Sequence, residues 1–230
     1  MPVHASIKSL DWENQFFQRH SAQLVWDEAA VLDPAQLDAF DLVQAKVDSR
    51  EMGRLDALQQ LGFRLVEGEA DLQLAVAAAE RQSGIRIARP EHIPALRTAA
   101  GAAFALSRFR APWYPANDSA RFYAQWIENA VRGAFDNQCL IAHDEQGKLQ
   151  GFVSLRELEG DAARIGLLAT LPTAQGQGVG TRLMLAALDW SRARRRNRLY
   201  VATQLSNLAA MRLYLRCGAV IERTAYWLYR

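Results

Sequence analysis

The sequence predicts an α+β protein in which a smaller α/β domain precedes a larger domain of strands and helices. Three observations lead to this prediction. A glycine-rich loop at residues 171–180 joins an expected strand to an amphipathic helix. After residue 84, strand and helix patterns follow in the order β-α-α-β-β-β-α-β-α-β. Residues 43–65 are similar to residues 199–221 at a constant offset along the chain.

Composition limits the classes of protein to consider. The chain has 230 residues, half of them hydrophobic, which is enough for two domains. A net charge of +2 argues against bulk nucleic-acid binding. No apolar run approaches the ~20 residues of a membrane helix, and no secretory signal pattern is present, so we expect a cytoplasmic protein without a membrane partner. Two isolated cysteines and four scattered histidines form no ligand cluster, so no metal is expected.

The first domain looks like a partial copy of the end of the chain. A shift of 156 positions brings residues 43–47 onto 199–203 and residues 55–65 onto 211–221. Each copy has the pattern strand, helix, glycine C-cap, strand. We therefore expect a truncated domain over residues 1–82 and a full domain over residues 83–230. Chance similarity between two ordinary β-α-β segments is the alternative.

The elements of the second domain follow from hydrophobic periodicity and turn residues. Pro90 ends a short strand, Asp118 begins a helix, and 144–148 form a hairpin turn. The expected strands are 84–90, 139–142, 149–155, 163–169, 199–203 and 220–229. The expected helices are 91–104, 179–194, 208–217 and one that begins at 118, in which Phe122, Trp126, Ile127, Ala130 and Val131 face inward.

The glycine-rich loop has the properties of a pyrophosphate site. Glycines allow close approach to the backbone N–H groups, and the following helix dipole adds partial positive charge. A P-loop would need Gly-Lys-Ser/Thr, but Thr181-Arg182 follows the last glycine. A dinucleotide-binding fingerprint would need G-x-G-x-x-G near the start of a domain, with an acidic residue ~20 positions later, and the spacing here does not fit that pattern. An ordinary tight turn remains as an alternative.

Two motifs resemble those of the GCN5-related N-acetyltransferases (GNAT). Residues 175–180 are similar to the Q/R-x-x-G-x-G/A loop that holds the pyrophosphate of coenzyme A in that family. Residues 207–219 are similar to its N-x-x-A-x-x-x-Y-x-x-x-G-F element, with Ala219 in place of phenylalanine. The resemblance covers residues 84–230. It implies a GNAT fold, with a mixed, centrally splayed sheet flanked by helices, and acetyl-CoA as co-substrate without a metal.

The resemblance also implies roles for individual residues. Backbone N–H groups of a bulged strand polarise the thioester, Asn207 binds the pantetheine arm, and Tyr214 donates a proton to the leaving sulfur. Asn207 and Tyr214 are seven positions apart, so they share a helix face. The expected coenzyme A contacts are Leu167, Leu168, Ala169, Gln175, Gly176, Gln177, Gly178, Val179, Gly180, Thr181 and Asn207. The alternatives are core roles for the leucines and Tyr214, and simple N-capping by Asn207.

The general base is less clearly marked. No histidine or carboxylate occupies a position diagnostic of the family. The repeat suggests Glu67, which follows the strand 64–66 of the partial copy, and Glu69 is its rival. Both are also explained as solvated turn carboxylates.

The loop 107–115 lies where GNAT enzymes form their acceptor site. Arg108 and Arg110 suit phosphates, since guanidinium binds them bidentately, and Trp113 or Tyr114 suits stacking on a pyrimidine. The alternative is a surface loop anchored by aromatic residues.

Five segments together resemble one narrower family, the dTDP-fucosamine acetyltransferases of enterobacterial common antigen biosynthesis. The segments are 12–17, 62–63, 107–114, 122–133 and 224–230. This resemblance implies acetylation of the 4-amino group of dTDP-4-amino-4,6-dideoxygalactose, a small nucleotide-sugar substrate, by direct transfer. The alternatives are an acetyltransferase for protein N-termini or ribosomal proteins, and a non-catalytic coenzyme A-binding module. The oligomeric state stays open, a homodimer included.

Overall fold

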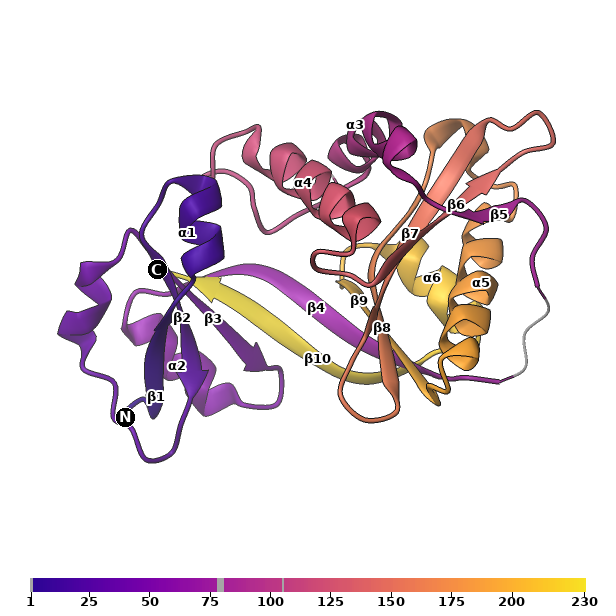
Figure 1. Ribbon diagram of the computed structural model, residues 1–230. Helices are drawn as coiled ribbons and strands as arrows, with labels where there is room; N and C mark the ends of the chain where they lie inside the picture. Colours follow the sequence, from indigo (N-terminus) through magenta and orange to yellow (C-terminus); the bar gives the residue numbers. More distant parts are fainter. Residues whose placement is uncertain (1, 78–80, 105) are drawn as a thin grey trace.

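One continuous sheet organises the molecule. The computed structural model describes residues 2–77, 81–104 and 106–230 (Figure 1). In these ranges ten strands form a single sheet in the order β1-β2-β3-β10-β4-β9-β8-β7-β6-β5. The strands are β1 (Ala5–Ser9), β2 (Ser21–Trp26), β3 (Leu42–Asp48), β4 (Arg64–Ala75), β5 (Ile85–Ile87), β6 (Gln138–His143), β7 (Leu149–Glu157), β8 (Ala162–Thr170), β9 (Arg198–Gln204) and β10 (Val220–Tyr229).

Six α-helices and three short 3₁₀ segments complete the described ranges. They are α1 (Asp11–Phe17), η1 (Pro34–Ala39), α2 (Met52–Gln60), η2 (Pro90–His92), α3 (Ile93–Ala103), α4 (Asp118–Arg132), η3 (Pro172–Ala174), α5 (Val179–Ala193) and α6 (Leu208–Arg216). The elements expected after residue 84 are all present, with ends displaced by a few residues. None of these helices is long and apolar enough to cross a membrane.

The two halves of the chain share the centre of the sheet. Figure 1 shows β4 and β10 side by side, running between the N-terminal and C-terminal parts. β4 comes from the first 82 residues, yet it pairs with β10 on one side and β9 on the other. The division into domains at residue 82 stays a prediction, and the sheet itself is continuous across it.

The expected internal repeat is confirmed in detail. β3 and β9 have bounds that differ by 156 at both ends, and so do α2 and α6. Pairing registers correspond as well, since Asp48↔Ala225 becomes Gln204↔Glu69 under the shift. Both helices end at a glycine with positive φ, 86° at Gly62 and 91° at Gly218. The copy is truncated, because only η1 joins β2 to β3 where α5 joins β8 to β9.

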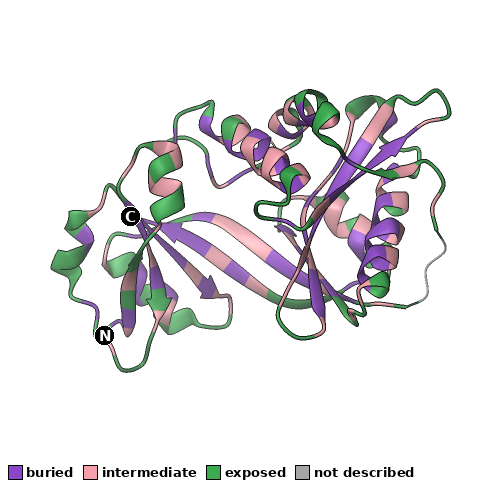
Figure 2. Cartoon of the chain, viewed as in Figure 1, coloured by how far each residue is buried: buried purple, intermediate pink, exposed green. Residues whose placement is uncertain are grey.

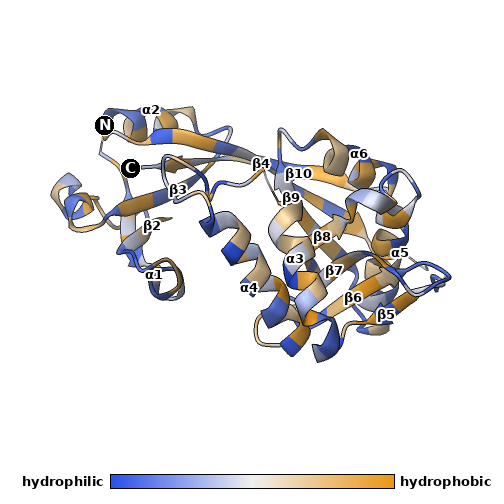
Figure 3. Cartoon of the chain, turned by 90° about the horizontal axis from the view of Figure 1, so that it is seen from above, coloured by the Kyte–Doolittle hydropathy of each residue, from blue (hydrophilic) through white to orange (hydrophobic). Residues whose placement is uncertain are grey.

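Helices cover both faces of the sheet. α5 and α6 pack on one face, where Leu183, Met184 and Tyr214 join a core with strand residues such as Leu155 and Val201. α3 and α4 pack on the opposite face. Figure 2 shows buried residues concentrated on the strands and on the inner sides of these helices. In Figure 3 the strands β6–β8 are largely hydrophobic, whereas α4 is mixed, as its amphipathic pattern predicts.

The sheet opens between β8 and β9. These strands pair in parallel only from Ala162↔Arg198 to Arg164↔Tyr200, and beyond that point no pairing between them is found in the described ranges. On its other side β8 stays paired with β7, with a bulge where the register shifts opposite Ser154. The mixed, centrally splayed sheet expected from the resemblance is therefore confirmed. The splay leaves backbone groups of β8 free to meet a ligand.

Candidate active site

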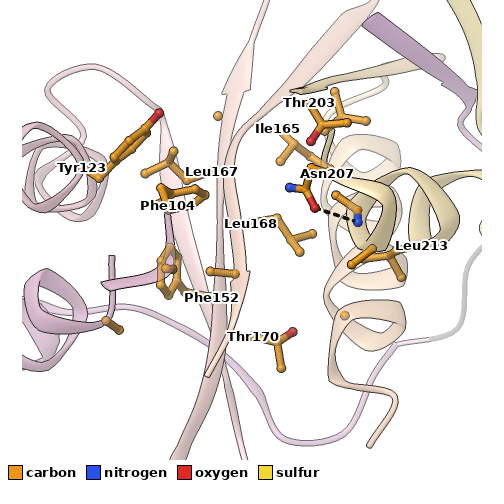
Figure 4. Close-up of a pocket in the computed structure, with 18 of the residues that line it drawn as sticks. Phe104, Tyr123, Phe152, Ile165, Leu167, Leu168, Thr170, Thr203, Asn207 and Leu213 are labelled. Carbon is orange, nitrogen blue, oxygen red and sulfur yellow. Dashed lines mark hydrogen bonds between the residues drawn. The ribbon is translucent and has the colours of Figure 1, made fainter. Parts of the chain in front are cut away.

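A large cavity occupies the splay of the sheet. Its volume is about 1160 Å³, and β8, β9, α3, α4, α6 and the N-terminus of α5 contribute to its wall. Figure 4 shows side chains on both sides of β8 pointing into this space. Thirteen of the predicted site residues line it: Glu67, Arg108, Leu167, Leu168, Ala169, Gln175, Gly176, Gly178, Val179, Gly180, Thr181, Asn207 and Tyr214. Gln177, Arg110, Trp113 and Tyr114 are not part of the wall.

The glycine-rich loop is shaped to receive an anion. Gly176 and Gly178 have φ values of 75° and 76°, and a Cβ at either would meet no atom within 4 Å, so open space lies beside them. Gly178 is the N-cap of α5, no side chain caps the helix, and its first turn carries no acidic residue. The first-turn N–H groups therefore face the cavity with the positive end of the helix dipole. Diphosphate chemistry fits this end of the cavity.

The last glycine of the loop, Gly180, lies where helices α5 and α6 approach each other closely. A Cβ on Gly180 would lie 2.9 Å from Leu213 Cδ2, so glycine lets α5 approach α6 here. Gln177 instead turns back, and its Nε2 donates to Thr173 O at 3.1 Å. The predicted contacts with coenzyme A stay predictions, but six of the seven residues 175–181 line the cavity.

Successive backbone N–H groups of the bulged strand β8 point to different sides. Leu171 N donates to Gln150 O on β7 at 2.8 Å. Because backbone groups alternate sides along a strand, the N–H groups of Leu168 and Thr170 point away from β7, toward the open side of the splay. Leu167 N is already bonded to Ser154 Oγ at 2.9 Å. Of the three residues named from the sequence, Leu168 is the one whose N–H is aimed into the cleft.

Asn207 and Tyr214 lie on the face of α6 that forms the wall. Asn207 Oδ1 accepts a hydrogen bond from Ala210 N at 3.2 Å, so Asn207 caps the helix, and its Nδ2 group remains for a ligand carbonyl (Figure 4). Tyr214 is 5% exposed, and burial raises the pKa of its hydroxyl well above the usual range. The hydroxyl therefore keeps its proton at neutral pH, as a general acid must.

The two candidate bases have different surroundings. Burial raises the pKa of Glu67 to about 7, and the charge of Glu69 adds to this, although Arg108, Arg110 and Gln204 oppose it. Glu69 forms an ion pair with Lys46 and accepts from Trp227 Nε1 at 3.0 Å. Glu69 is thus engaged in holding strands together, whereas Glu67 is tuned to titrate near neutral pH. General-base function suits Glu67 better.

The loop 107–115 divides between the cavity and the core. Arg108 lines the cavity, and its Nη1 donates to Gln44 Oε1 at 2.6 Å and to Tyr229 Oη at 2.5 Å. Arg110 Nη2 donates to Val66 O at 3.0 Å. Tyr114 is only 3% exposed.

The loop is also tied to the N-terminal part of the chain. Gln44 Nε2 donates to Tyr114 Oη at 3.1 Å, and the guanidinium of Arg64 lies 4.7 Å from the ring centroid of Trp113. The expected stacking surface of Trp113 and Tyr114 is therefore turned to protein neighbours. None of Trp113, Tyr114 and Arg110 lines the cavity, so their predicted contact with a substrate stays a prediction.

A second group of wall residues was not distinguished by the sequence. Tyr123 and Trp126 on α4, Phe104 after α3, and Phe152 and Arg156 on β7 line the side of the cavity opposite the glycine-rich loop. Figure 4 shows Phe104, Tyr123 and Phe152 on this side of β8. Helical spacing predicted only that Trp126 faces inward, and it did not mark Tyr123. A wet cavity and a dry core have the same sequence pattern, so no local signal separates them.

No residues in the described ranges gather as a group of three or more His, Cys, Asp or Glu side chains suited to a metal ion. The cavity wall instead combines amides, carboxylates, phenols and guanidinium groups. These are groups for acid–base and hydrogen-bond chemistry.

The comparisons place this architecture in a known family. Residues 103–219 match the acetyltransferase (GNAT) family, and the chain belongs to it. It is 55% identical over 231 residues to the dTDP-fucosamine acetyltransferase of Escherichia coli O6:H1, with both chains covered in full. It is 23% identical over 200 residues to the spore coat polysaccharide biosynthesis protein SpsD of Bacillus subtilis, covering 84% of this chain and 67% of that one.

Solved structures confirm the fold. A GCN5-related N-acetyltransferase from Sphaerobacter thermophilus superposes with a TM-score of 0.63 at 15% identity, covering 98% of this chain and 76% of that one. At that identity the similarity concerns the fold alone.

Proposed function

We propose that the protein transfers an acetyl group from acetyl-CoA to the 4-amino group of dTDP-4-amino-4,6-dideoxygalactose, dTDP-fucosamine, as a step of enterobacterial common antigen biosynthesis. The substrate rests on the full-length identity of 55% with the Escherichia coli protein of that name. That identity extends over the N-terminal part and the loop 107–115, which contact each other next to the cavity. The acceptor side is thus included in the similarity.

The chemistry rests on one observation: Glu67, Tyr214 and the strand carrying the Leu168 amide face the same cavity. Acetyl-CoA supplies the acetyl group as a thioester. The first-turn amides of α5 are suited to its diphosphate, and Asn207 Nδ2 to a carbonyl of its pantetheine arm. The residues present therefore fit this co-substrate.

Three groups of the chain act in the transfer. Glu67, with its pKa of about 7, accepts the proton that the sugar amine must lose before it attacks. The Leu168 N–H donates a hydrogen bond to the thioester oxygen as negative charge grows there. Tyr214 Oη donates its proton to the departing sulfur. These steps need no covalent enzyme intermediate, and neither Cys139 nor Cys217 is part of the cavity wall.

Charge in the cavity favours two anionic ligands. Four arginines and two glutamates are among its described wall residues: Arg108, Arg156, Arg164, Arg216, Glu67 and Glu69. Arg164 is held by Asp71, with a 2.7 Å bond between Nη2 and Oδ1. Arg108 lies near Glu67, whose pKa it lowers, so its charge reaches the acceptor side. We assign Arg108 to the charged sugar nucleotide because, of the four loop residues named from the sequence, it alone lines the cavity.

A substrate panel tests the proposal. Thiol release from acetyl-CoA is measured with dTDP-4-amino-4,6-dideoxygalactose, its C4 epimer, and peptides with free N-termini. We expect the galactose derivative to be the best acceptor, with the acetylated sugar identified by mass spectrometry. A preference for peptides would refute the sugar assignment. Acetyl-CoA binding without transfer to any acceptor would indicate a non-catalytic binding module.

A further inference from the structure

A buried polar chain lies behind the bulge of β8. Asp136, between α4 and β6, and Ser154 on β7 are both 0% exposed. Ser154 Oγ lies 2.6 Å from Asp136 Oδ2 and 2.9 Å from Leu167 N. Apolar side chains would fill this space without the cost of burying polar groups. The buried Asp136–Ser154 pair therefore requires an explanation beyond packing.

The direction of each hydrogen bond follows from proton counting. A serine hydroxyl has one proton, and an amide can only donate. Ser154 Oγ therefore accepts from Leu167 N–H and donates its own proton to Asp136 Oδ2. The 2.6 Å separation falls in the range of charge-assisted O–H···O⁻ bonds. Trp126 Nε1 donates to the same oxygen at 2.9 Å, so two donors fix the Asp136 side chain.

The other oxygen of Asp136 faces a cation. Oδ1 has no hydrogen-bond partner in the described ranges, and Arg156 Nη1 lies 3.9 Å from it. Arg156 also belongs to the cavity wall, and it forms an ion pair with this buried carboxyl group.

The hydrogen bonds of Ser154 lie directly at the bulge. Val153 pairs with Leu168 and Leu155 with Ile165, so two residues of β8, Gly166 and Leu167, oppose the single residue between them on β7. There the Leu167 amide bonds to the serine side chain.

Glycine is required at the first bulge position. A Cβ at Gly166 would lie 2.3 Å from Asp136 Oδ2 and 2.8 Å from Ser154 Oγ. The polar chain is thus packed directly against the bulged backbone. Because amides alternate sides, a Leu167 N–H that is held on the β7 side goes with a Leu168 N–H on the cleft side.

We propose that Asp136 and Ser154 are positioning residues, which hold the Leu167 amide on the β7 side so that the Leu168 N–H points at the thioester carbonyl. The inference rests on the use of acetyl-CoA in the proposed function, but not on the identity of the acceptor. Neither residue needs to touch a substrate. Their effect passes through two hydrogen bonds and one bulge.

The test uses Ser154→Ala and Ser154→Cys in the full-length protein. Alanine removes both hydrogen bonds, and cysteine keeps the shape of the side chain, with a somewhat larger atom that is a weak donor and acceptor. Ser191→Ala is the matched control, because its hydroxyl is also fully buried and, within the described part of the chain, bonds only to Ala187 O on α5, at 2.8 Å. Melting temperatures establish that each variant is folded.

The primary readout is the infrared carbonyl band of bound acetyl-CoA labelled with ¹³C at the carbonyl, which needs no acceptor. We expect the band to lie at lower frequency in the wild type and Ser191→Ala than in either Ser154 variant, because the aimed N–H polarises the carbonyl. Turnover should fall about tenfold to hundredfold, below the ~10²–10³-fold loss when such a donor is removed entirely. Affinity for free coenzyme A, measured by calorimetry, should stay unchanged.

Two results would overturn the inference. One is a folded Ser154 variant with the wild-type carbonyl band and turnover. The other is an equal loss of coenzyme A affinity and turnover, which would indicate general damage to the fold. A wild-type protein that does not bind acetyl-CoA would overturn the proposed function itself. A wrong acceptor assignment would leave the carbonyl band and its dependence on Ser154 intact.

Discussion

The pH dependence of turnover offers a sharp test of Glu67 as the base. Its pKa of about 7, raised chiefly by burial, makes its ionisation visible in the physiological range. At one pH unit below the pKa about one tenth of the carboxyl is ionised, and at one unit above it about nine tenths. The rate should therefore fall about tenfold between pH 8 and pH 6. Initial rates of thiol release across this range measure it.

Two variants separate Glu67 from other titrating groups. Glu67→Gln should abolish the fall in rate between pH 8 and pH 6, which is the acidic limb of the pH–rate profile. It should also lower turnover by about 10²–10⁴-fold, the usual contribution of a general base. Glu69→Gln is the matched control, because Glu69 lies two residues after Glu67 and therefore on the same side of β4. It should keep the limb but move it to lower pH, because Glu69 raises the pKa of Glu67. A limb that persists unchanged in Glu67→Gln would refute the assignment and point to the substrate amine.

The same pKa shift has a consequence for stability. The folded pKa of about 7 lies above the ordinary value of 4.5, so the folded state binds this proton more tightly than the unfolded state. Stability from this group is fully present below pH ~4.5 and is lost as pH rises through 7. At ~1.4 kcal/mol per pKa unit, the difference of about 2.5 between the two pKa values corresponds to a loss of at most about 3.5 kcal/mol. Chemical denaturation should find Glu67→Gln more stable than the wild type at pH 8, and the advantage should shrink toward pH 5.

Three further substitutions test the other groups of the cavity. Gly178→Val should weaken acetyl-CoA binding strongly in calorimetry, whereas Gly147→Val, with a φ of 79° in a hairpin turn outside the cavity wall, strains the backbone equally and should leave affinity unchanged. Tyr214→Phe should lower turnover by about 10²–10⁴-fold with little change in coenzyme A affinity, and near-normal turnover would make Tyr214 only a core aromatic. Arg108→Ala should raise the KM for the sugar nucleotide by about one to two orders of magnitude, since a charge-assisted bond contributes ~1.5–3 kcal/mol, and it should leave the KM for acetyl-CoA unchanged. Arg110→Ala, outside the wall, is its control; equal effects of both would contradict the distinction drawn from the cavity.

Local sequence determined the parts of the site that depend on neighbouring residues. The glycine-rich loop, the helix after it and the common face of Asn207 and Tyr214 follow from backbone freedom and helical periodicity, which act over a few residues. The 156-residue repeat was equally visible, because strand, helix and glycine cap recur in the same order. Its bounds and pairing registers in the structure agree with that offset.

Tertiary structure alone decided which residues of the loop 107–115 line the cavity. The sequence could not show that Arg108 lies at the cavity wall whereas Tyr114 is buried. Both side chains bond to Gln44, which lies 64 positions before the arginine and reaches the loop only through the assembled sheet. The pKa of Glu67 and the link from Asp136 to the bulge have the same origin. Burial and hydrogen-bond direction are properties of the assembled sheet, whereas periodicity is a property of the chain. This is why the glycine-rich loop and its helix could be predicted and the direction of the Leu168 N–H could not.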